Sequence, residues 1–275
     1  MRSIAILLTV HNRKNKTLKC LNHIYNQINL DITFIIDIYM VDDGSTDGTS
    51  KAIQEHFPNV NIIPGDGNLY WNRGMHLAWN IASKSDNYEY YLWLNDDTMI
   101  HSYCISTLLE SSNLQKNQII VGTTNSLIDA FGTVTYGGRD LNNRLIIPNG
   151  NIQECQRFNG NIVLIPKYVF DMVGFNDEYF HHGLGDFDYG LRALKLGVKS
   201  FIAPQILGTC ERHDTLPTWC NPERNILDRF KHFSTPTGAQ LMGVYTFEKR
   251  HYGAHIALYN YINILFRVLF PKYWI

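Results

Sequence analysis

The chain has 275 residues, 45% of them hydrophobic and 13% aromatic, and its formal net charge is −1. This composition supports a large buried core and excludes a disordered chain, and the near-neutral charge argues against a nucleic-acid-binding protein. The five cysteines form no CxxC pair and the N-terminus shows no secretory signal, so we expect reduced thiols and a cytoplasmic location.

The first fifty residues alternate strand-like and helix-like patterns. Residues 3–10 (SIAILLTV) form an apolar run typical of a buried strand, and a polar turn at 11–13 and a helical apolar pattern follow it. A second apolar run at 34–41 ends in the acidic turn 42–49 (DDGSTDGT). This order of elements predicts an α/β fold with a parallel βαβ sheet.

The acidic turn also resembles the opening of a calcium-binding helix–loop–helix, because Asp43, Ser45, Asp47 and Gly48 have the required spacing. The twelfth position is Gln54, which cannot supply a bidentate carboxylate, and a strand pattern precedes the turn. We therefore reject a calcium site here.

A third apolar run at 90–94 ends in two adjacent carboxylates, Asp96 and Asp97. Ligands of open α/β sheets bind at the carboxyl ends of strands. Adjacent hard oxygen donors there suit Mg²⁺ or Mn²⁺, which take one or two protein carboxylates and fill the rest of their shell with substrate phosphates. The alternative is an ordinary strand end with Asp at a turn.

Several blocks of sequence follow one another along the chain, namely TVHNR at 9–13, VDDGSTDGT at 41–49, NRG at 72–74, LNDDT at 94–98, 158–180 and GDFDYGLRALKLG at 185–197. In this order and spacing they resemble the family 2 glycosyltransferases, which are inverting enzymes of the GT-A fold that use nucleotide-activated sugars. The resemblance extends over roughly residues 3–215. It implies a mixed, mainly parallel sheet flanked by helices, and it is greatest for bacterial rhamnosyl- or galactosyl-type transferases of polysaccharide biosynthesis.

The resemblance implies a nucleotide-sugar site at the ends of the first two strands. Thr9, His11 and Arg13 would come from the loop after the first strand, and Asp42 and Asp43 would accept hydrogen bonds from the base or ribose. A nucleoside-diphosphate sugar is therefore the expected donor.

The resemblance also implies a site for Mn²⁺ or Mg²⁺ beside the donor diphosphate. Asp97 would bind the metal directly, Asp96 would contact the sugar or a metal-bound water, and Arg73 would lie near the base and phosphates. His213 is placed as a second metal or diphosphate ligand. Asn95 stands where many members carry a first Asp and is expected in the donor site.

Asp186 matches the Asp of the family's Glu-Asp pair, which the resemblance implies is the catalytic base, but Gly185 replaces the Glu. Asp186 and Asp188 point apart if they lie on a helix, so we expect one to face the site while the other faces solvent or caps the helix. The alternative role for Asp186 is a plain N-cap of a helix at 187–196.

Three further features concern the acceptor side. Residues 125–150 read as hairpins and loops, which commonly form one wall of an acceptor site in this family. His181-His182 either contact the acceptor or pack within a loop. Tyr70-Trp71 either stack on a base or sugar or pack beneath the loop.

From residue 221 the pattern becomes helical. We expect a helix starting at Pro222 after an Asn221 cap, another after Thr237, and a third over 254–270. Residues 221–275 contain seven Lys and Arg against three Asp and Glu, which favours a helix lying on an anionic membrane surface. The alternative is a helix packed on the catalytic domain or on a second copy.

The sequence thus predicts a GT-A catalytic domain at 1–220 and a helical, membrane-associating region at 221–275. The catalytic domain would comprise a nucleotide-sugar half at 1–98 and an acceptor half at 99–220. The expected acceptor is a glycan or lipid-linked glycan, and the expected location is peripheral on the inner face of the cell membrane. Two rival functions remain, a nucleotidyltransferase and a catalytically inactive sugar-nucleotide-binding or scaffold subunit. The first would need a glycine-rich loop after the first strand, and residues 9–16 contain no glycine.

Overall fold

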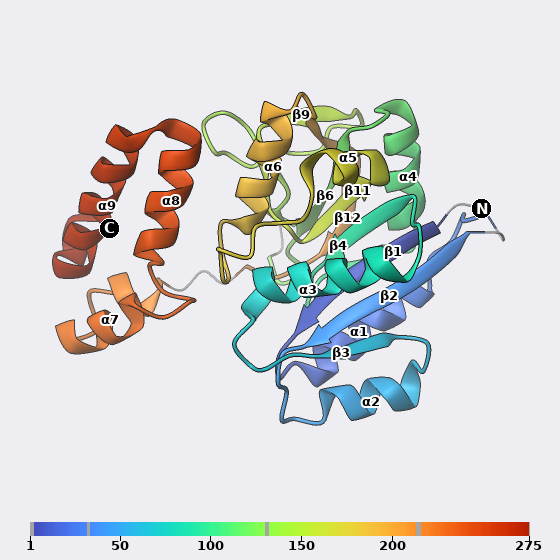
Figure 1. The fold of residues 1–275 in the computed structure, drawn as a ribbon, viewed down its shortest axis with the longest axis horizontal. Coiled ribbons are helices and arrows are strands. Elements are labelled where there is room, and N and C mark those ends of the chain that lie inside the picture. The colour runs from blue at the N-terminus through green and yellow to red at the C-terminus, as the bar shows by residue number, and fades with distance from the viewer. Residues whose placement is uncertain (1–2, 32–33, 130–131, 213–215, 275) are drawn as a thin grey trace.

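One mixed sheet organises most of the chain, of which the computed structural model describes residues 3–31, 34–129, 132–212 and 216–274 (Figure 1). In the described residues the sheet has ten strands, eight of them in the order β3-β2-β1-β4-β11-β6-β12-β5, with β7 beside β6 and β9 beside β12. These strands are β1 (Ser3–Val10), β2 (Ile35–Asp42), β3 (Asn61–Pro64), β4 (Tyr90–Leu94), β5 (Met99–Ile100), β6 (Ile119–Asn125), β7 (Val134–Tyr136), β9 (Gln153–Cys155), β11 (Ile162–Pro166) and β12 (Ser200–Thr209).

The adjacent strands β3, β2, β1 and β4 are all parallel, as the predicted βαβ pattern requires. Strand β11 runs antiparallel between β4 and β6, and β12 is again parallel to β6. A separate two-stranded sheet pairs β8 (Gly138–Arg139) with β10 (Arg157–Phe158). The expected mixed α/β sheet flanked by helices is confirmed.

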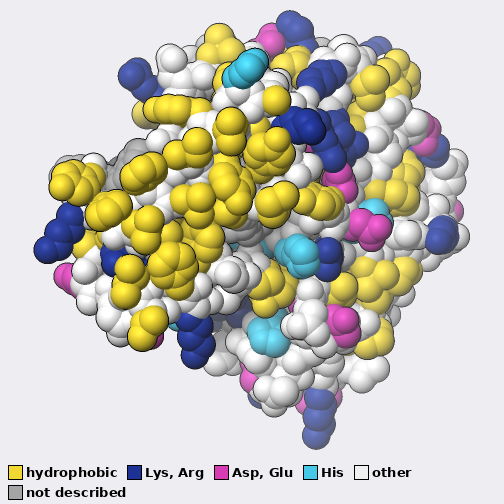
Figure 2. Space-filling view, turned by 60° about the vertical axis from the view of Figure 1, so that its left-hand side comes forward, with side chains coloured by type: hydrophobic (Ala, Val, Ile, Leu, Met, Phe, Trp, Pro, Cys, Tyr) yellow, Lys and Arg dark blue, Asp and Glu magenta, His cyan; other side chains and the backbone are white. Residues whose placement is uncertain are grey.

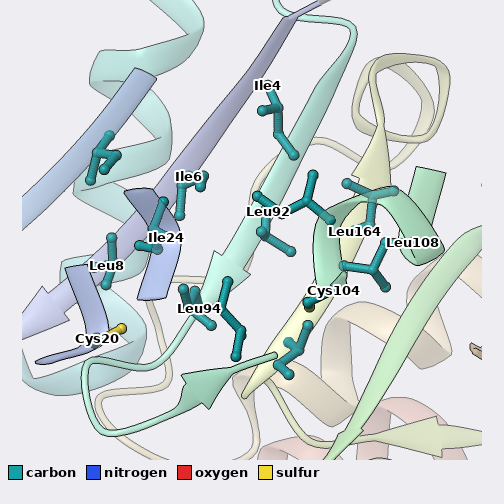
Figure 3. Close-up of a cluster of buried hydrophobic side chains, with 14 of the residues drawn as sticks. Ile4, Ile6, Leu8, Cys20, Ile24, Leu92, Leu94, Cys104, Leu108 and Leu164 are labelled. Atoms are coloured by element: carbon teal, nitrogen blue, oxygen red, sulfur yellow. The ribbon is translucent and has the colours of Figure 1, made fainter. Parts of the chain in front are cut away.

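Helices cover both faces of the sheet, which explains why β1 is buried along its whole length. Ile4, Ile6 and Leu8 face one layer of helices (Figure 3), and Ala5 and Leu7 face the other, because successive strand side chains point to opposite faces. The first layer is α1 (Lys14–Tyr25), α2 (Thr49–His56) and α4 (Cys104–Leu114). The second is α3 (Tyr70–Ser85), α5 (Lys167–Val173) and α6 (Gly185–Lys195).

The C-terminal helices lie together at one side of this core (Figure 1). They are α7 (Ile226–Phe233), α8 (Leu241–Tyr252) and α9 (Ala254–Leu269), with short 3₁₀ turns at Thr218–Cys220 and Pro271–Trp274. Among the residues that the structure describes, no helix is both long and apolar enough to cross a bilayer.

The expected helix start at Pro222 is wrong. The side chain of Asn221 instead accepts a hydrogen bond from the backbone N–H of Glu223, which closes a local turn. The helix α7 begins four residues later, at Ile226, where Asn225 Oδ1 accepts from the backbone N–H of Asp228 and caps the first turn.

A buried carboxylate joins α6 to α8. Asp188 is fully buried, and its Oδ2 accepts from Arg192 Nε at 2.8 Å within α6. Its Oδ1 accepts from Arg250 Nη1 at 2.7 Å and lies 2.9 Å from His251 Nε2, both on α8. The expectation that the second acidic residue of α6 faces solvent or caps the helix is therefore wrong, because partners more than sixty positions away bury and neutralise it.

Candidate active site

The carboxyl ends of β1, β2 and β4 meet at one edge of the sheet, as their register with Val10 beside Asp42 and Leu7 beside Trp93 requires. A cavity of about 530 Å³ opens there. It collects residues predicted from separate sequence blocks, namely Thr9, His11, Arg13, Asp43, Asn95, Asp96, Asp97 and Asp186.

Of the predicted site residues that the structure describes, Arg73 and Asp42 do not line this cavity. The helix α3 already begins at Tyr70, so Arg73 lies within a helix, and its Nε donates to the carbonyl oxygen of Glu178 at 2.9 Å. His213 lies outside the described residues.

The acidic turn after β2 organises two loops. Asp42, which does not line the cavity, accepts a hydrogen bond from the backbone N–H of Ser45 and so closes its own turn. The Asp43 carboxylate accepts backbone N–H bonds from Gly67 and Tyr70, both at 2.8 Å. Asp43 therefore fixes the glycine-rich loop that enters α3 at the cavity wall.

The acidic pair after β4 is held by a cation from the loop after β1. Arg13 Nη1 lies 3.2 Å from Asp96 Oδ1 and 2.8 Å from Asp97 Oδ2. Burial raises the pKa of Asp96 to about 6, against the opposing charge of Arg13 and a hydrogen bond from Thr17. The Cys210 thiol lies 3.6 Å from Asp97 Oδ1, within reach for a weak S–H donation.

Asp96 and Asp97 offer carboxylate oxygens to a divalent cation at the cavity wall. No group of three or more His, Cys, Asp or Glu suited to a metal occurs within the described ranges. Mg²⁺ and Mn²⁺ at a diphosphate site need only one or two carboxylates, which Asp96 and Asp97 provide on the cavity wall. The residues present therefore fit a substrate-assisted metal site and do not fit a closed protein cage.

Asn95, which stands where many relatives carry Asp, is fixed by the indole of Trp71. Trp71 Nε1 donates to Asn95 Oδ1 at 2.7 Å, and the Asn95 backbone N–H donates to the Asn161 carbonyl. An aspartate could accept the same bond, so the replacement keeps the contact and removes one negative charge. Trp71 both lines the cavity and packs edge-on against Trp93, with ring centroids 5.9 Å apart.

Asp186 enters the cavity from the first turn of α6. The helix begins at Gly185 with Leu184 as its cap residue, so Asp186 is not a plain N-cap. Its Oδ2 accepts from the backbone N–H of Gly160 at 2.9 Å. Burial raises the pKa of Asp186 to about 6, while this hydrogen bond and the charge of Arg139 act in the opposite direction. A carboxyl with this pKa is ionised at neutral pH and still basic enough to take a proton.

Several cavity residues had no role in the sequence interpretation. Asn159, Gly160 and Asn161 lie between β10 and β11, and Thr237 brings the C-terminal region to the same cavity. The stretch FNGN at 158–161 opens one of the blocks that resemble the family, but it contains no titratable side chain that would have marked it as part of a site. The sequence left the roles of Tyr70-Trp71 and His181-His182 open, and of these Tyr70, Trp71 and His182 line the cavity. Tyr136, from the region 125–150 that is expected to form the acceptor wall, lines it as well.

Comparison of the sequence with known protein families identifies the family of this chain. The family model described as glycosyl transferase family 2 matches residues 5–169. The chain belongs to this family. Membership supports a sugar-transfer role, and the match spans the ends of β1, β2 and β4 that frame the cavity.

Parts of this family 2 chain are similar in sequence to two curated proteins. A teichoic acid poly(glycerol phosphate) polymerase of Staphylococcus epidermidis is 32% identical over 117 residues, which are 41% of this chain and 15% of that protein. A chondroitin synthase of Escherichia coli is 26% identical over 138 residues, which are 49% of this chain and 19% of that protein. The chain thus spans less than a fifth of the length of either curated relative.

Solved structures support the GT-A fold expected for the family. The mannosyltransferase PcManGT from Pyrobaculum calidifontis, in complex with GDP-Man and Mn²⁺, superposes with a TM-score of 0.60 at 13% identity, covering 98% of this chain and 73% of that one. The S. aureus protein TarS 1–349, in complex with UDP, gives 0.56 at 13% identity, covering 92% and 72%. At such identity the likeness concerns the fold alone.

Proposed function

We propose that this family 2 protein is an inverting, metal-dependent glycosyltransferase. It moves a sugar from a nucleoside-diphosphate sugar to a hydroxyl of a glycan or lipid-linked glycan in surface polysaccharide synthesis. The observation that carries the proposal is that one cavity holds both the Asp96–Asp97 pair and Asp186. The polymer-forming relatives and the fold neighbours bound to GDP-Man with Mn²⁺ or to UDP support it.

The donor side is assigned to the ends of β1, β2 and β4. Asp97, with Asp96 beside it, would hold Mg²⁺ or Mn²⁺, which when bound supplies positive charge against the negative charge that builds on the departing diphosphate. Arg13 keeps both carboxylates aligned toward the cavity through its two contacts. His11, Asp43 and the loop that Asp43 fixes would border the nucleoside.

The acceptor side is assigned to Asp186. Its carboxylate takes the proton of the acceptor hydroxyl as the oxygen attacks the anomeric carbon. The new glycosidic bond forms while the bond from that carbon to the diphosphate oxygen breaks, so the nucleoside diphosphate leaves with the bonding electrons. A single displacement inverts the anomeric configuration and needs no covalent enzyme intermediate, unlike a retaining glycosidase.

The proposal keeps residues 1–220 as the catalytic domain and 221–275 as its helical appendage. The family match favours glycosyl transfer over nucleotidyl transfer. An inactive scaffold is the remaining rival, because of Asn95 and Gly185. The hydrogen bond that Asn95 retains with Trp71 and the ionisable base at Asp186 both favour an active enzyme.

The proposal is tested by measuring nucleoside diphosphate released from a panel of nucleotide sugars with Mn²⁺, Mg²⁺ or EDTA. We expect one donor to be hydrolysed slowly without acceptor, in a reaction that EDTA abolishes. Donor binding by calorimetry, without release from any donor in the presence of candidate acceptors, would favour the scaffold instead.

A further inference from the structure

The helix α9 buries Ala257 and Val268 against the protein, and it is also apolar on the side that faces outward. Its outward face carries Leu258, Ile262 and Phe266, whose exposed fractions are 53%, 43% and 53%. These residues are spaced by four, so they form one stripe along the helix. A helix that packs on a protein normally buries such a stripe.

Two polar side chains of α9 point toward the protein. Asn260 hydrogen-bonds Glu248 on α8, and the guanidinium of Arg267 lies 5.5 Å from the ring centroid of Trp219. These two side chains therefore find their partners within the chain. The apolar side has no cover within the described chain, because Leu258 and Phe266 are both half exposed.

Neighbouring elements extend this apolar face. On α7, Leu227 is 79% exposed and Phe230 is 43% exposed, and Tyr273 after α9 is 86% exposed. Figure 2 turns this side of the molecule forward and shows hydrophobic side chains gathered into one broad field with Lys and Arg side chains along its borders. We call the outward face of α7, α9 and Tyr273 the C-terminal apolar face.

The charges of residues 221–275 indicate what binds to the C-terminal apolar face. Arg224, Lys231, Lys249 and Lys272 are exposed, and residues 221–275 carry seven Lys and Arg against three Asp and Glu. A second copy of the chain would bring the same positive charge against itself, whereas anionic lipid headgroups complement it. A terminal tyrosine beside an apolar stripe is also common at the level of the headgroups.

We propose that the C-terminal apolar face docks on an anionic lipid bilayer surface, with its apolar side chains at the boundary between headgroups and acyl chains. The docking does not require the transferase reaction. Its use in presenting a lipid-linked acceptor does rest on the proposed function. That use is supported by Thr237, which lines the cavity, and by the contacts of Asp188 that fix α8 to the helix of Asp186.

The test is co-sedimentation of the full chain with vesicles of neutral phosphatidylcholine, with and without one third phosphatidylglycerol. We expect binding to the anionic vesicles and at least about a tenfold lower partition coefficient for the double variant Ile262→Asp, Phe266→Asp. The matched control is Ile28→Asp, Leu114→Asp, which changes two side chains that are 51% and 75% exposed on the catalytic domain. The control should bind as the wild type does.

A second pair of variants separates charge from apolar contact. Lys231→Glu with Lys249→Glu should weaken binding to anionic vesicles roughly tenfold or more and change little with neutral ones. Circular dichroism and donor hydrolysis without vesicles should be unchanged in all variants. Failure of donor hydrolysis would therefore count against the proposed function and leave the vesicle result intact.

Two outcomes would overturn the inference. One is a wild-type chain that fails to bind anionic vesicles. The other is a dimer in analytical ultracentrifugation that Ile262→Asp, Phe266→Asp dissolves, with vesicle binding equal in the wild type and this variant, which would make a second copy the occupant.

Discussion

Asn72 occupies the space that a side chain at Gly185 would need. A Cβ atom at position 185 would lie 1.8 Å from Asn72 Oδ1. Asn72 is fully buried, and its Nδ2 donates to the carbonyl oxygens of Asp177 and Phe180, both at 2.7 Å. A side chain such as glutamate at position 185, directly before Asp186, is therefore excluded by a residue that holds the loop before α6.

The first prediction concerns this pair. Gly185→Ala should lower the free energy of unfolding by about 1–3 kcal/mol, because an extra carbon must displace a well-packed side chain. In an Asn72→Ala background the same substitution should cost much less. Urea unfolding of the four variants in a double-mutant cycle measures this coupling. Additive costs would show that the two positions do not compete for space.

The second prediction concerns the metal. Asp97→Ala should abolish Mn²⁺-dependent donor binding and lower kcat/KM by about 10²–10³-fold, because the charge on the leaving diphosphate loses its counter-charge. Calorimetry with and without EDTA measures the binding. Asp171→Ala is the matched control, since this exposed Asp pairs with Lys167 within its own helix. Normal metal-dependent binding by the Asp97 variant would remove Asp97 from the site.

The third prediction separates the base from the donor site. Asp186→Asn should leave donor affinity within a few-fold of the wild type and lower transfer by about 10²–10⁴-fold, because the amide cannot take a proton. Calorimetry gives the affinity, and product formation with acceptor gives the rate. Asp188→Asn is a poor control because it perturbs packing, so Asp171→Asn, at an exposed carboxylate that pairs with Lys167, is preferred. Undiminished transfer would assign the base elsewhere.

The fourth prediction is a pH profile. Burial raises the pKa of Asp186 to about 6, and the base must be ionised, so kcat/KM should fall as the pH drops through about 6. The charge of Arg139 lowers this pKa. Arg139→Gln should therefore move the acidic limb of the profile to higher pH. A limb that stays in place in this variant would mean that another group controls it.

The fifth prediction concerns the link between α6 and α8. Burial raises the pKa of Asp188, but hydrogen bonds from His251, Arg192 and Arg250 outweigh it and leave the pKa below its usual value. The stabilisation is thus complete above the ordinary Asp pKa and is lost as the pH falls through the lower folded value. Asp188→Asn should cost about 3–5 kcal/mol at pH 7 and less in strong acid, as measured by unfolding at each pH. An equal cost at every pH would point to packing alone.

The parts of the fold that the sequence predicted best are those governed by local pattern. Strands β1 and β4 are apolar along their length because both faces are covered, and the polar residues that follow them mark the edge where the cavity lies. The strand-end rule pointed to Asp97, and the family pattern pointed to Asp186. In the structure both residues line the same cavity.

The sequence was least informative where the position of a side chain depends on residues far away in the chain. Asp188 was correctly expected to point away from Asp186, but its partners on α8 could not be found from helix geometry. Arg73 was expected near the base and phosphates, and it lies within the helix α3, where its Nε donates to the carbonyl oxygen of Glu178. Hydrophobic periodicity gives the angle between two faces of a helix but not which face turns outward. The outward direction of the apolar stripe on α9 therefore could not be predicted from the sequence.

The shared carboxylate of Asp188 has a consequence for chain synthesis. Residues 250 and 251 emerge from the ribosome long after α6, so until then Asp188 Oδ1 lacks both of its α8 partners. A chain truncated after residue 220 would lack both partners and the helix that covers this carboxylate. The helix α6 is therefore expected to reach its final order only late in translation, and the shortest stably folded form should extend past His251.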